Sequence, residues 1–349
     1  MQETNQINPK SSTDFVCPLC RKPLMQYTES YQCTHCQRDY PILFGIADFR
    51  LRSDPYLSLE EERAKAKRLV TEVKQDFSSM LDYYYEITDD VPPALAARYK
   101  AYQQNGPKQA RHSLASLSLS ANDTLLDAGC GTGGALIAAA ENCSQLYGMD
   151  IALRWLVICQ QRLKEQGVTA TLICADIESP PFADQRFSKI VATDLLENVY
   201  SVEKTLSTLS QLLTIKGKLW VAGSNKFCLG PHPTTRLWAI GYFPIAVRKR
   251  LLHFFRGVDS LRFINLISPQ FVVDFSKQIG LHALVLRPRM VTMNSNNTYP
   301  LIDRILIKIY SIITRMPLFS QLMVQVGPAF ELILTKSARH IEQKETKIS

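Results

Sequence analysis

Thr124-Leu-Leu-Asp-Ala-Gly-Cys-Gly-Thr-Gly-Gly134 has the pattern of a hydrophobic strand that ends in a carboxylate, followed by a glycine-rich turn and the small-residue start of a helix. Glycines allow a sharp turn and let a ligand approach the backbone closely. The helix that follows offers free N–H groups and the positive end of its dipole. The pattern predicts a turn that holds an adenine-containing cofactor at the carboxyl edge of a parallel sheet.

The glycines alone fit two cofactor classes. Gly129, Gly131 and Gly134 satisfy the G-x-G-x-x-G pattern of dinucleotide sites, whereas Gly129, Gly131 and Gly133 satisfy the G-x-G-x-G pattern of methyltransferases. Asp127, two residues before the turn, favours the second class. A carboxylate there would repel a pyrophosphate, but it could pair with the amino-acid ammonium group of S-adenosylmethionine.

Further acidic residues follow at the ends of the next strands. Asp150 ends a second strand, where it could accept hydrogen bonds from two ribose hydroxyls. A third strand, 169–175, ends at Asp176, which could accept from an adenine amino group. A fourth strand, 189–193, leads into Asp194. Four motifs in this order and spacing favour a methyltransferase-type site.

From about residue 122 to residue 223 the chain resembles the class I S-adenosylmethionine-dependent methyltransferases. The resemblance implies an α/β, Rossmann-like seven-stranded sheet whose last two strands, 281–286 and 330–335, form a hairpin. It also implies the cofactor-binding residues, which are Asp127, Gly129, Cys130, Gly131, Gly133, Asp150, Ile151, Asp176, Ile177 and Asp194. Asn198 departs from the pattern, because many small-molecule members have His there and an amide cannot act as a general base.

A metal site is predicted near the start of the chain. Cys17-Pro-Leu-Cys20 and Cys33-Thr-His-Cys36 are two C-x2-C pairs, a spacing that suits a structural, tetrahedral Zn²⁺ site. The segment resembles the zinc-ribbon-like modules that precede some methyltransferases. Arg21 and Gln37 stand where such turns often have Gly. We expect the metal mainly to stabilise the module.

Length and charge suggest how the chain is divided. We expect a zinc-ribbon-like module at 13–50, a helical linker or cofactor lid at 51–120, and a methyltransferase domain at 121–349 with acceptor-side insertions at 225–260 and 290–326. Residues 1–215 contain 21 Lys or Arg and 26 Asp or Glu, whereas residues 216–349 contain 19 and 6. The basic C-terminal third would attract an anionic partner.

We expect a cytoplasmic protein, with contact to the inner face of the membrane as one possibility. Residues 1–10 are polar and lack the apolar run of a signal peptide, and nine cysteines without such a signal suit a reducing compartment. A predicted helix at 301–316 carries Arg304, Lys308 and Arg315 on one stripe among isoleucines and leucines. Such a helix suits either an anionic membrane surface or a buried position with its basic edge in water.

Methyl transfer to a hydroxyl requires removal of a proton, and three residues are candidates for this role. His232 lies between two prolines in the first insertion, and Asp194 and Glu197 follow the fourth strand. The sequence favours a methyltransferase for a small-molecule or lipid-like acceptor, with O-methylation as the expected chemistry. Methylation of rRNA or tRNA, and a non-catalytic S-adenosylmethionine-binding or zinc-ribbon interaction protein, are the alternatives. The oligomeric state stays open.

Overall fold

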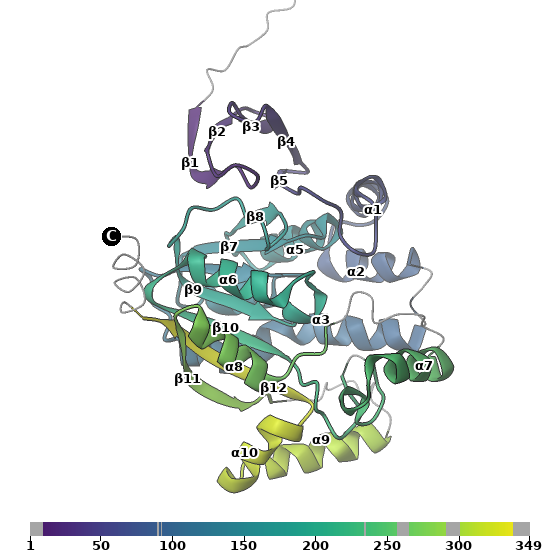
Figure 1. The fold of residues 1–349 in the computed structure, drawn as a ribbon. Helices are drawn as coiled ribbons and strands as arrows, with labels where there is room; N and C mark the ends of the chain where they lie inside the picture. Colours follow the sequence, from purple (N-terminus) through teal and green to yellow (C-terminus); the bar gives the residue numbers. More distant parts are fainter. Residues whose placement is uncertain are drawn as a thin grey trace, which may run out of the picture.

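One mixed sheet runs through the molecule (Figure 1). The structure is a computed structural model that describes residues 10–88, 91, 93–233, 235–256, 265–290 and 301–337. The strand order is β1-β2-β3-β4-β5-β8-β7-β6-β9-β10-β12-β11. The strands are β1 Lys10–Val16, β2 Pro23–Gln26, β3 Ser30–Cys33, β4 Arg38–Leu43, β5 Ile46–Asp48, β6 Thr124–Ala128, β7 Gln145–Asp150, β8 Thr171–Cys174, β9 Phe187–Thr193, β10 Leu213–Ser224, β11 Leu281–Pro288 and β12 Ala329–Lys336.

The segment β8-β7-β6-β9-β10-β12-β11 is the predicted seven-stranded, Rossmann-like sheet. The first five of these strands pair in parallel, and β12 pairs antiparallel with both β10 and β11. The strand order reverses beside β6, so the turn after β6 opens into a crevice where ligands bind in such sheets. The predicted fold class is therefore confirmed. The β8 strand is shorter than the expected 169–175, and both hairpin strands extend beyond 281–286 and 330–335.

Helices cover both faces of this sheet and divide the buried side chains into two clusters. Leu206 of α6 and Val272 of α8 belong to one cluster, together with residues of the N-terminal module. Leu136 of α4 and Leu156 of α5 belong to the other, with residues of α1 to α3. The helices are α1 Leu59–Thr71, α2 Phe77–Glu86, α3 Pro93–Leu114, α4 Gly134–Ala139, α5 Leu153–Glu165, α6 Val202–Leu212, α7 Ile245–Arg256, α8 Pro269–Gln278, α9 Leu301–Ile313 and α10 Pro317–Val326, with short 3₁₀ turns at Ala115–Leu117, Leu196–Asn198 and Ile240–Tyr242.

The N-terminal module is hydrogen-bonded to the central sheet. β1 to β4 form an antiparallel ribbon, as expected for the predicted β module. Short β5 pairs antiparallel with β4 and parallel with β8. The ribbon therefore continues the sheet at the β8 edge, above the rest of the molecule in Figure 1.

The predicted helical linker consists of three helices. Ser58 caps α1, and the Glu61 side chain accepts a hydrogen bond from the Ser58 backbone, which completes a capping box. Leu69, Val73, Phe77 and Leu81 recur every four residues, but α1 ends before Phe77, so this apolar spacing runs across two helices. Leu69 and Leu81 are both fully buried. The three domain boundaries stay predictions.

Both of the predicted insertions contain helices. The first contains α7 and the second contains α9 and α10, at the lower end of the molecule in Figure 1. Residues 257–260 of the first insertion and 291–300 of the second lie outside the described residues. Within the described residues, no helix is long and apolar enough to cross a bilayer.

Candidate functional site

A cavity of about 620 Å³ opens at the carboxyl edge of the sheet. Nine of the ten predicted cofactor residues line it, namely Asp127, Gly129, Cys130, Gly131, Asp150, Ile151, Asp176, Ile177 and Asp194. Gly133, the tenth, is not among its lining residues. The ends of β6, β7, β8 and β9 thus place their polar residues around one space, as the strand order predicts.

The glycines of the turn have different roles. Gly129 and Gly131 have φ of +76° and +49°, a backbone region that L side chains rarely adopt. Gly133 also has a positive φ, and a Cβ there would lie 2.6 Å from Cys159 Sγ. A Cβ on Gly134 would lie 2.9 Å from the Cα of Gly106 in α3. Packing of α3 and α5 therefore explains the last two glycines.

Two acidic side chains lie beside the turn. The Asp150 carboxylate accepts hydrogen bonds from the backbone N–H groups of Gly131 and Ala152, both at 2.9 Å. Burial raises the pKa of Asp150 above its usual range. Asp127 is 2% exposed, and burial together with the nearby Asp150 charge raises its pKa to about 7. A buried carboxyl of this kind suits a cationic ligand group, which would restore its charged form.

Asp176 is held by an arginine that the sequence analysis did not single out. Arg52 Nε donates to Asp176 Oδ2 at 2.5 Å, and its guanidinium also lies 3.1 Å from Glu178. The same guanidinium lies 3.7 Å from the ring centre of Tyr200. Asp176 Oδ1 accepts from the Glu178 N–H. The wall at the predicted adenine position therefore includes a cation and an aromatic ring besides the expected carboxylate.

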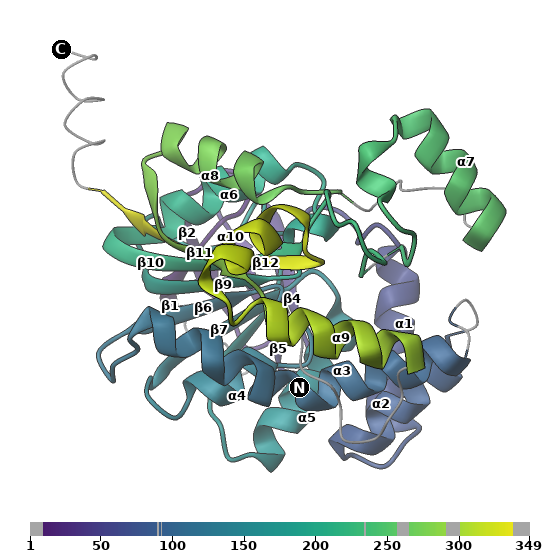
Figure 2. The same cartoon turned by 90° about the horizontal axis from the view of Figure 1, so that it is seen from below.

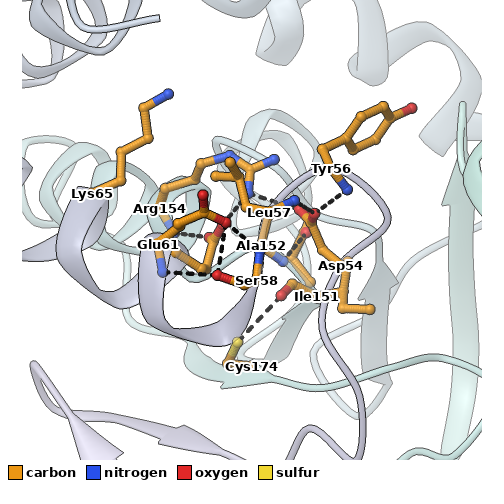
Figure 3. Close-up of polar contacts among 12 residues, drawn as sticks. Asp54, Tyr56, Leu57, Ser58, Glu61, Lys65, Ile151, Ala152, Arg154 and Cys174 are labelled. Atoms are coloured by element: carbon orange, nitrogen blue, oxygen red, sulfur yellow. Dashed lines mark hydrogen bonds and ion pairs between the residues drawn. The ribbon is translucent and has the colours of Figure 1, made fainter.

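The segment 49–57, called the strap below, forms one wall of the cavity. Asp54 and Tyr56 of the strap line the cavity. Asp54 Oδ1 accepts from the Tyr56 and Leu57 N–H groups, and Asp54 Oδ2 accepts from Arg154 at 2.7 Å (Figure 3). Arg154 also pairs with buried Glu62 of α1. These contacts join the strap, α1 and the start of α5 behind the predicted ribose position.

Another part of the cavity lining brings together residues far apart in the sequence. Arg289 donates to Asp194 Oδ1 at 2.6 Å, and Tyr102 of α3 donates to the other Asp194 oxygen. Asp194 has φ of +53°, in the left-handed region. Such backbone strain in a non-glycine residue is concentrated at functional sites. Asn198 also lines the cavity, and its side-chain N–H donates to the Asp194 carbonyl.

The other two predicted bases lie away from this lining. His232 is 1% exposed, its Nδ1 accepts from the Thr235 N–H, and burial lowers its pKa to about 4. Glu197 is also buried and accepts from the Ser224 N–H and hydroxyl. Burial and the Asp194 charge raise the Glu197 pKa to about 7. Of the three candidates, Asp194 is the one among the cavity's lining residues. The catalytic roles stay predictions.

The four predicted metal ligands converge. The Sγ atoms of Cys17, Cys20, Cys33 and Cys36 all lie within 4.8 Å of one another. Cys17 and Cys36 are 3.6 Å apart, and Cys20 and Cys33 are 3.4 Å apart. A tetrahedral Zn²⁺ with Zn–S bonds of about 2.3 Å places its sulfur atoms roughly 3.8 Å apart. The cluster therefore fits a structural zinc ion.

The backbone explains the glycine preference noted above. Arg21 and Gln37 have φ of +62° and +55°, so each turn needs a left-handed residue after its second cysteine. Arg21 gains contacts in return, because its guanidinium donates to the carbonyl groups of Pro180 and Phe182. These bonds fasten the ribbon to the loop that follows β8.

Comparison with known proteins agrees with this geometry. Residues 126–221 match the family model described as "Methyltransferase domain". The match begins in β6 and ends in β10, so it covers the strands that surround the glycine turn. This part of the chain therefore has the sequence pattern of a methyltransferase domain, and the sheet around it has the class I strand order. The matched strands β6, β7, β8 and β9 carry the four acidic residues of this domain at their carboxyl ends.

Curated relatives match the methyltransferase domain in part. A Pseudomonas putida protein named "Probable fatty acid methyltransferase" is 31% identical over 40% of this chain and 37% of its own length. The sterol 4-C-methyltransferase strm-1 of Caenorhabditis elegans is 29% identical over 32% and 34%. A demethylmenaquinone methyltransferase of Tropheryma whipplei is 31% identical over 34% and 46%. The chain thus spans less than half of the length of these relatives.

Solved structures show weaker similarity. A phosphoethanolamine N-methyltransferase of Haemonchus contortus, in complex with S-adenosylmethionine, aligns with a TM-score of 0.44 at 15% identity. That alignment covers 66% of this chain and 52% of the other. The fold assignment therefore depends on this protein's own strand order and pairing.

Sequence reasoning missed the residues that reach the cavity from outside the matched segment. They include Asp54 and Tyr56 of the strap, Gln103 of α3, and Arg289 and Met290 after β11. Tyr102 belongs to the segment 51–120, which was predicted as a helical linker or cofactor lid, and it lines the cavity. Nothing in the local pattern marks Arg289, because its partner Asp194 is 95 residues away.

Proposed function

We propose that this protein transfers a methyl group from S-adenosylmethionine to a small-molecule or lipid-like acceptor, with oxygen as the expected methylated atom. The observation that carries the proposal is the convergence of Asp127, Asp150, Asp176 and Asp194 on one cavity beside the glycine turn. The bound cofactor supplies an activated methyl group on a sulfonium sulfur. The protein then has to orient the acceptor and exclude water.

Each acidic residue of the cavity has a distinct role in this proposal. Asp127 would hold the ammonium group of the cofactor, Asp150 the ribose hydroxyls and Asp176 the adenine amino group. Asp194, fixed by Arg289 and Tyr102, faces the remaining space and is our first candidate to accept a proton from a hydroxyl. His232 and Glu197 are the other two candidate bases, although neither is among the cavity's lining residues. The cysteine cluster would hold a structural Zn²⁺.

The acceptor class is supported by two observations. The partly matched relatives are named for fatty acid, sterol and demethylmenaquinone substrates, all largely apolar. The acceptor side of this protein also exposes many large apolar side chains on α7, α9 and α10. A cytoplasmic location, at the inner face of the membrane when the acceptor resides there, follows from this proposal.

Incubation of the purified protein with methyl-labelled S-adenosylmethionine and a cell extract tests the proposal. We expect label in the lipid or small-molecule fraction, and we expect Asp127→Ala to abolish it through loss of cofactor binding. The matched control is Asp123→Ala, since Asp123 ends the loop before β6 and is not among the cavity's lining residues. Calorimetry with S-adenosylmethionine alone reports the binding step separately.

RNA methylation is the second candidate, because residues 216–349 contain 19 Lys or Arg and only 6 Asp or Glu. This excess of positive charge suits a phosphate backbone. Label in the RNA fraction, with activity that falls steeply between about 50 and 200 mM salt, would favour it. Cofactor binding without label in any fraction would instead favour a non-catalytic binding protein.

A further inference from the structure

The second insertion exposes a large apolar surface. Six side chains from α9 and its C-terminal end, and three from α10, are between 47% and 86% exposed. They are Leu301, Ile302, Ile305, Ile309, Ile312, Met316, Leu318, Phe319 and Leu322. We call this set the α9–α10 surface. An amphipathic helix of a globular protein normally turns such residues toward the core.

The apolar side of α9 faces outward. Tyr310, on the opposite side of the helix, is 8% exposed and packs inward. Lys308 is exposed and lies at one edge of the outward face of α9. Arg315 is also exposed, but it lies in the turn after α9, which ends at Ile313 and so is shorter than the predicted helix at 301–316. Arg304, one turn before Lys308, is half-buried. Along α10 the sequence Pro317–Val326 has no charged residue.

The inner side of the same element borders the cavity. Tyr310 donates from its hydroxyl to the Arg289 carbonyl at 3.0 Å. Arg289 and its neighbour Met290 line the cavity, and Met290 is 41% exposed. Figure 2 shows α9 and α10 together on the face seen from below. The α9–α10 surface therefore lies next to the acceptor side of the site.

We propose that the α9–α10 surface docks on the anionic face of a phospholipid bilayer, with α9 and α10 lying in the interface plane. Apolar side chains would enter the boundary between headgroups and acyl chains, and Arg304, Lys308 and Arg315 would meet the anionic headgroups. Docking would bring Met290, an exposed lining residue of the cavity, close to the lipid. Docking itself does not depend on the proposed function. Its role, which is to deliver a lipid-like acceptor from the bilayer to the cavity, rests on the proposed function.

Charge and polarity favour a bilayer over the other partners. A nucleic acid offers phosphates for the cations but leaves nine exposed apolar side chains facing water or phosphate. A two-fold contact with a second copy would bury the apolar side chains, but it would leave the basic edge without a partner of opposite charge. An anionic bilayer matches both the apolar face and the basic edge of the α9–α10 surface.

Vesicle flotation tests the apolar part of the surface. We expect the full-length protein to float with vesicles of phosphatidylcholine and phosphatidylglycerol, and much less with phosphatidylcholine alone. The double substitution Ile309→Gln and Ile312→Gln should abolish flotation. The matched control, Leu284→Gln with Ile215→Gln, changes two exposed apolar residues on strands β11 and β10 and should float like the wild type.

A second pair of variants tests the basic edge. Lys308→Gln with Arg315→Gln should weaken partitioning onto the anionic vesicles roughly tenfold to thirtyfold, since each cation near such a surface contributes about a fivefold effect. Lys67→Gln with Lys164→Gln lowers the net charge equally at exposed positions on α1 and α5 and should change little. Equal losses in both pairs would show a non-specific charge effect and overturn the inference.

Two further results would overturn the docking proposal and leave the proposed function unaffected. One is no flotation by a protein that still binds S-adenosylmethionine in calorimetry. The other is a concentration-dependent dimer in light scattering that the Ile309 and Ile312 substitutions abolish. Conversely, flotation by a protein that fails to bind S-adenosylmethionine would refute the proposed function but would still support membrane docking by the α9–α10 surface.

Discussion

Asp127 is a buried carboxyl whose pKa is raised to about 7, and it would face a ligand's ammonium group. Only the ionised carboxylate pairs well with that cation, so binding of S-adenosylmethionine should release a proton from the protein below pH 7. We expect the protein's affinity for S-adenosylmethionine to rise by close to tenfold per pH unit up to about pH 7. At higher pH the affinity should fall again, because the ligand's α-amino group, with a pKa near 7.7–8.0, loses its proton.

Calorimetry in buffers of different ionisation enthalpy measures this proton release directly. The variant Asp127→Asn should bind weakly and with little pH dependence below pH 7. A wild-type affinity that stays constant from pH 5.5 to pH 7 would show that Asp127 is not the group facing the ammonium.

Two of the candidate bases, Asp194 and His232, can be compared by their kinetic effects. Asp194→Asn keeps the shape of the side chain and should lower turnover by at least roughly tenfold, and calorimetry with S-adenosylmethionine separates this loss from weaker cofactor binding, since Asp194 also lines the cofactor cavity. His232→Ala should lower turnover by a similar factor if His232 acts as a base. A loss of thermal stability with unchanged turnover would instead assign His232 to packing, in agreement with its burial. Steady-state kinetics and thermal unfolding of the same preparations make this comparison.

Glu197 differs from Asp194 in its effect on stability. Its pKa is higher in the folded protein, about 7, than the usual 4.5, because burial and Asp194 disfavour its charge. The folded state therefore holds this proton more tightly, and the carboxyl costs stability as pH rises from about 4.5 to 7. Glu197→Gln can still accept from the Ser224 N–H, so it should raise the unfolding midpoint at pH 8 more than at pH 5.

Among the elements, the two metal-binding turns show how a local pattern constrains the backbone. Gln37 adopts φ of +55° and its side chain makes one exposed hydrogen bond, to the Thr34 carbonyl. Gln37→Gly should therefore stabilise the ribbon by about 0.5–1 kcal/mol. Arg21→Gly relieves a similar strain but removes the bonds to Pro180 and Phe182, so it should give no gain or a loss. Denaturant unfolding of the metal-loaded protein compares the two variants.

The elements also show which parts of the fold can be predicted. Strand-ending acids and glycines made β6 to β9 predictable because local sequence determines both the strand and the turn. The separation of α1 from α2 was missed, because an apolar stripe at fourfold spacing continues across the break at residues 72–76. Arg52 and Arg289 were missed for a different reason. Their partners, Asp176 and Asp194, become neighbours only through the packing of distant segments.

In the whole molecule, the metal cluster and the cofactor cavity are joined through the strap. The ribbon ends in β5, and the buried Asp48–Arg50 ion pair, with Arg50 also donating to the Ile151 carbonyl, fixes the start of the strap. Arg52 and Asp54 then contact the cavity wall. Because a structural zinc ion stabilises the fold around its ligands, metal loss should loosen the strap and weaken S-adenosylmethionine binding, although no cysteine ligand lines the cavity.

Removal of metal by a chelator, followed by calorimetry with S-adenosylmethionine, measures this coupling. We expect at least a roughly tenfold loss of affinity, restored by added Zn²⁺. A strap variant, Arg52→Gln, should reproduce part of the loss in the metal-loaded protein. Unchanged affinity after complete metal removal would show that the ribbon and the cavity are independent.

The pairing of β5 with β8 also bears on what happens if the ribbon is cut away. β8, Thr171–Cys174, is covered on one side by β7 and on the other by β5. A fragment that begins after the strap would leave the outer side of β8 with unpaired backbone N–H and C=O groups. An uncovered apolar edge of this kind recruits strands from other chains. We therefore expect β5 to protect the rest of the molecule from aggregation, and a truncated version of this protein should precipitate before it loses its fold.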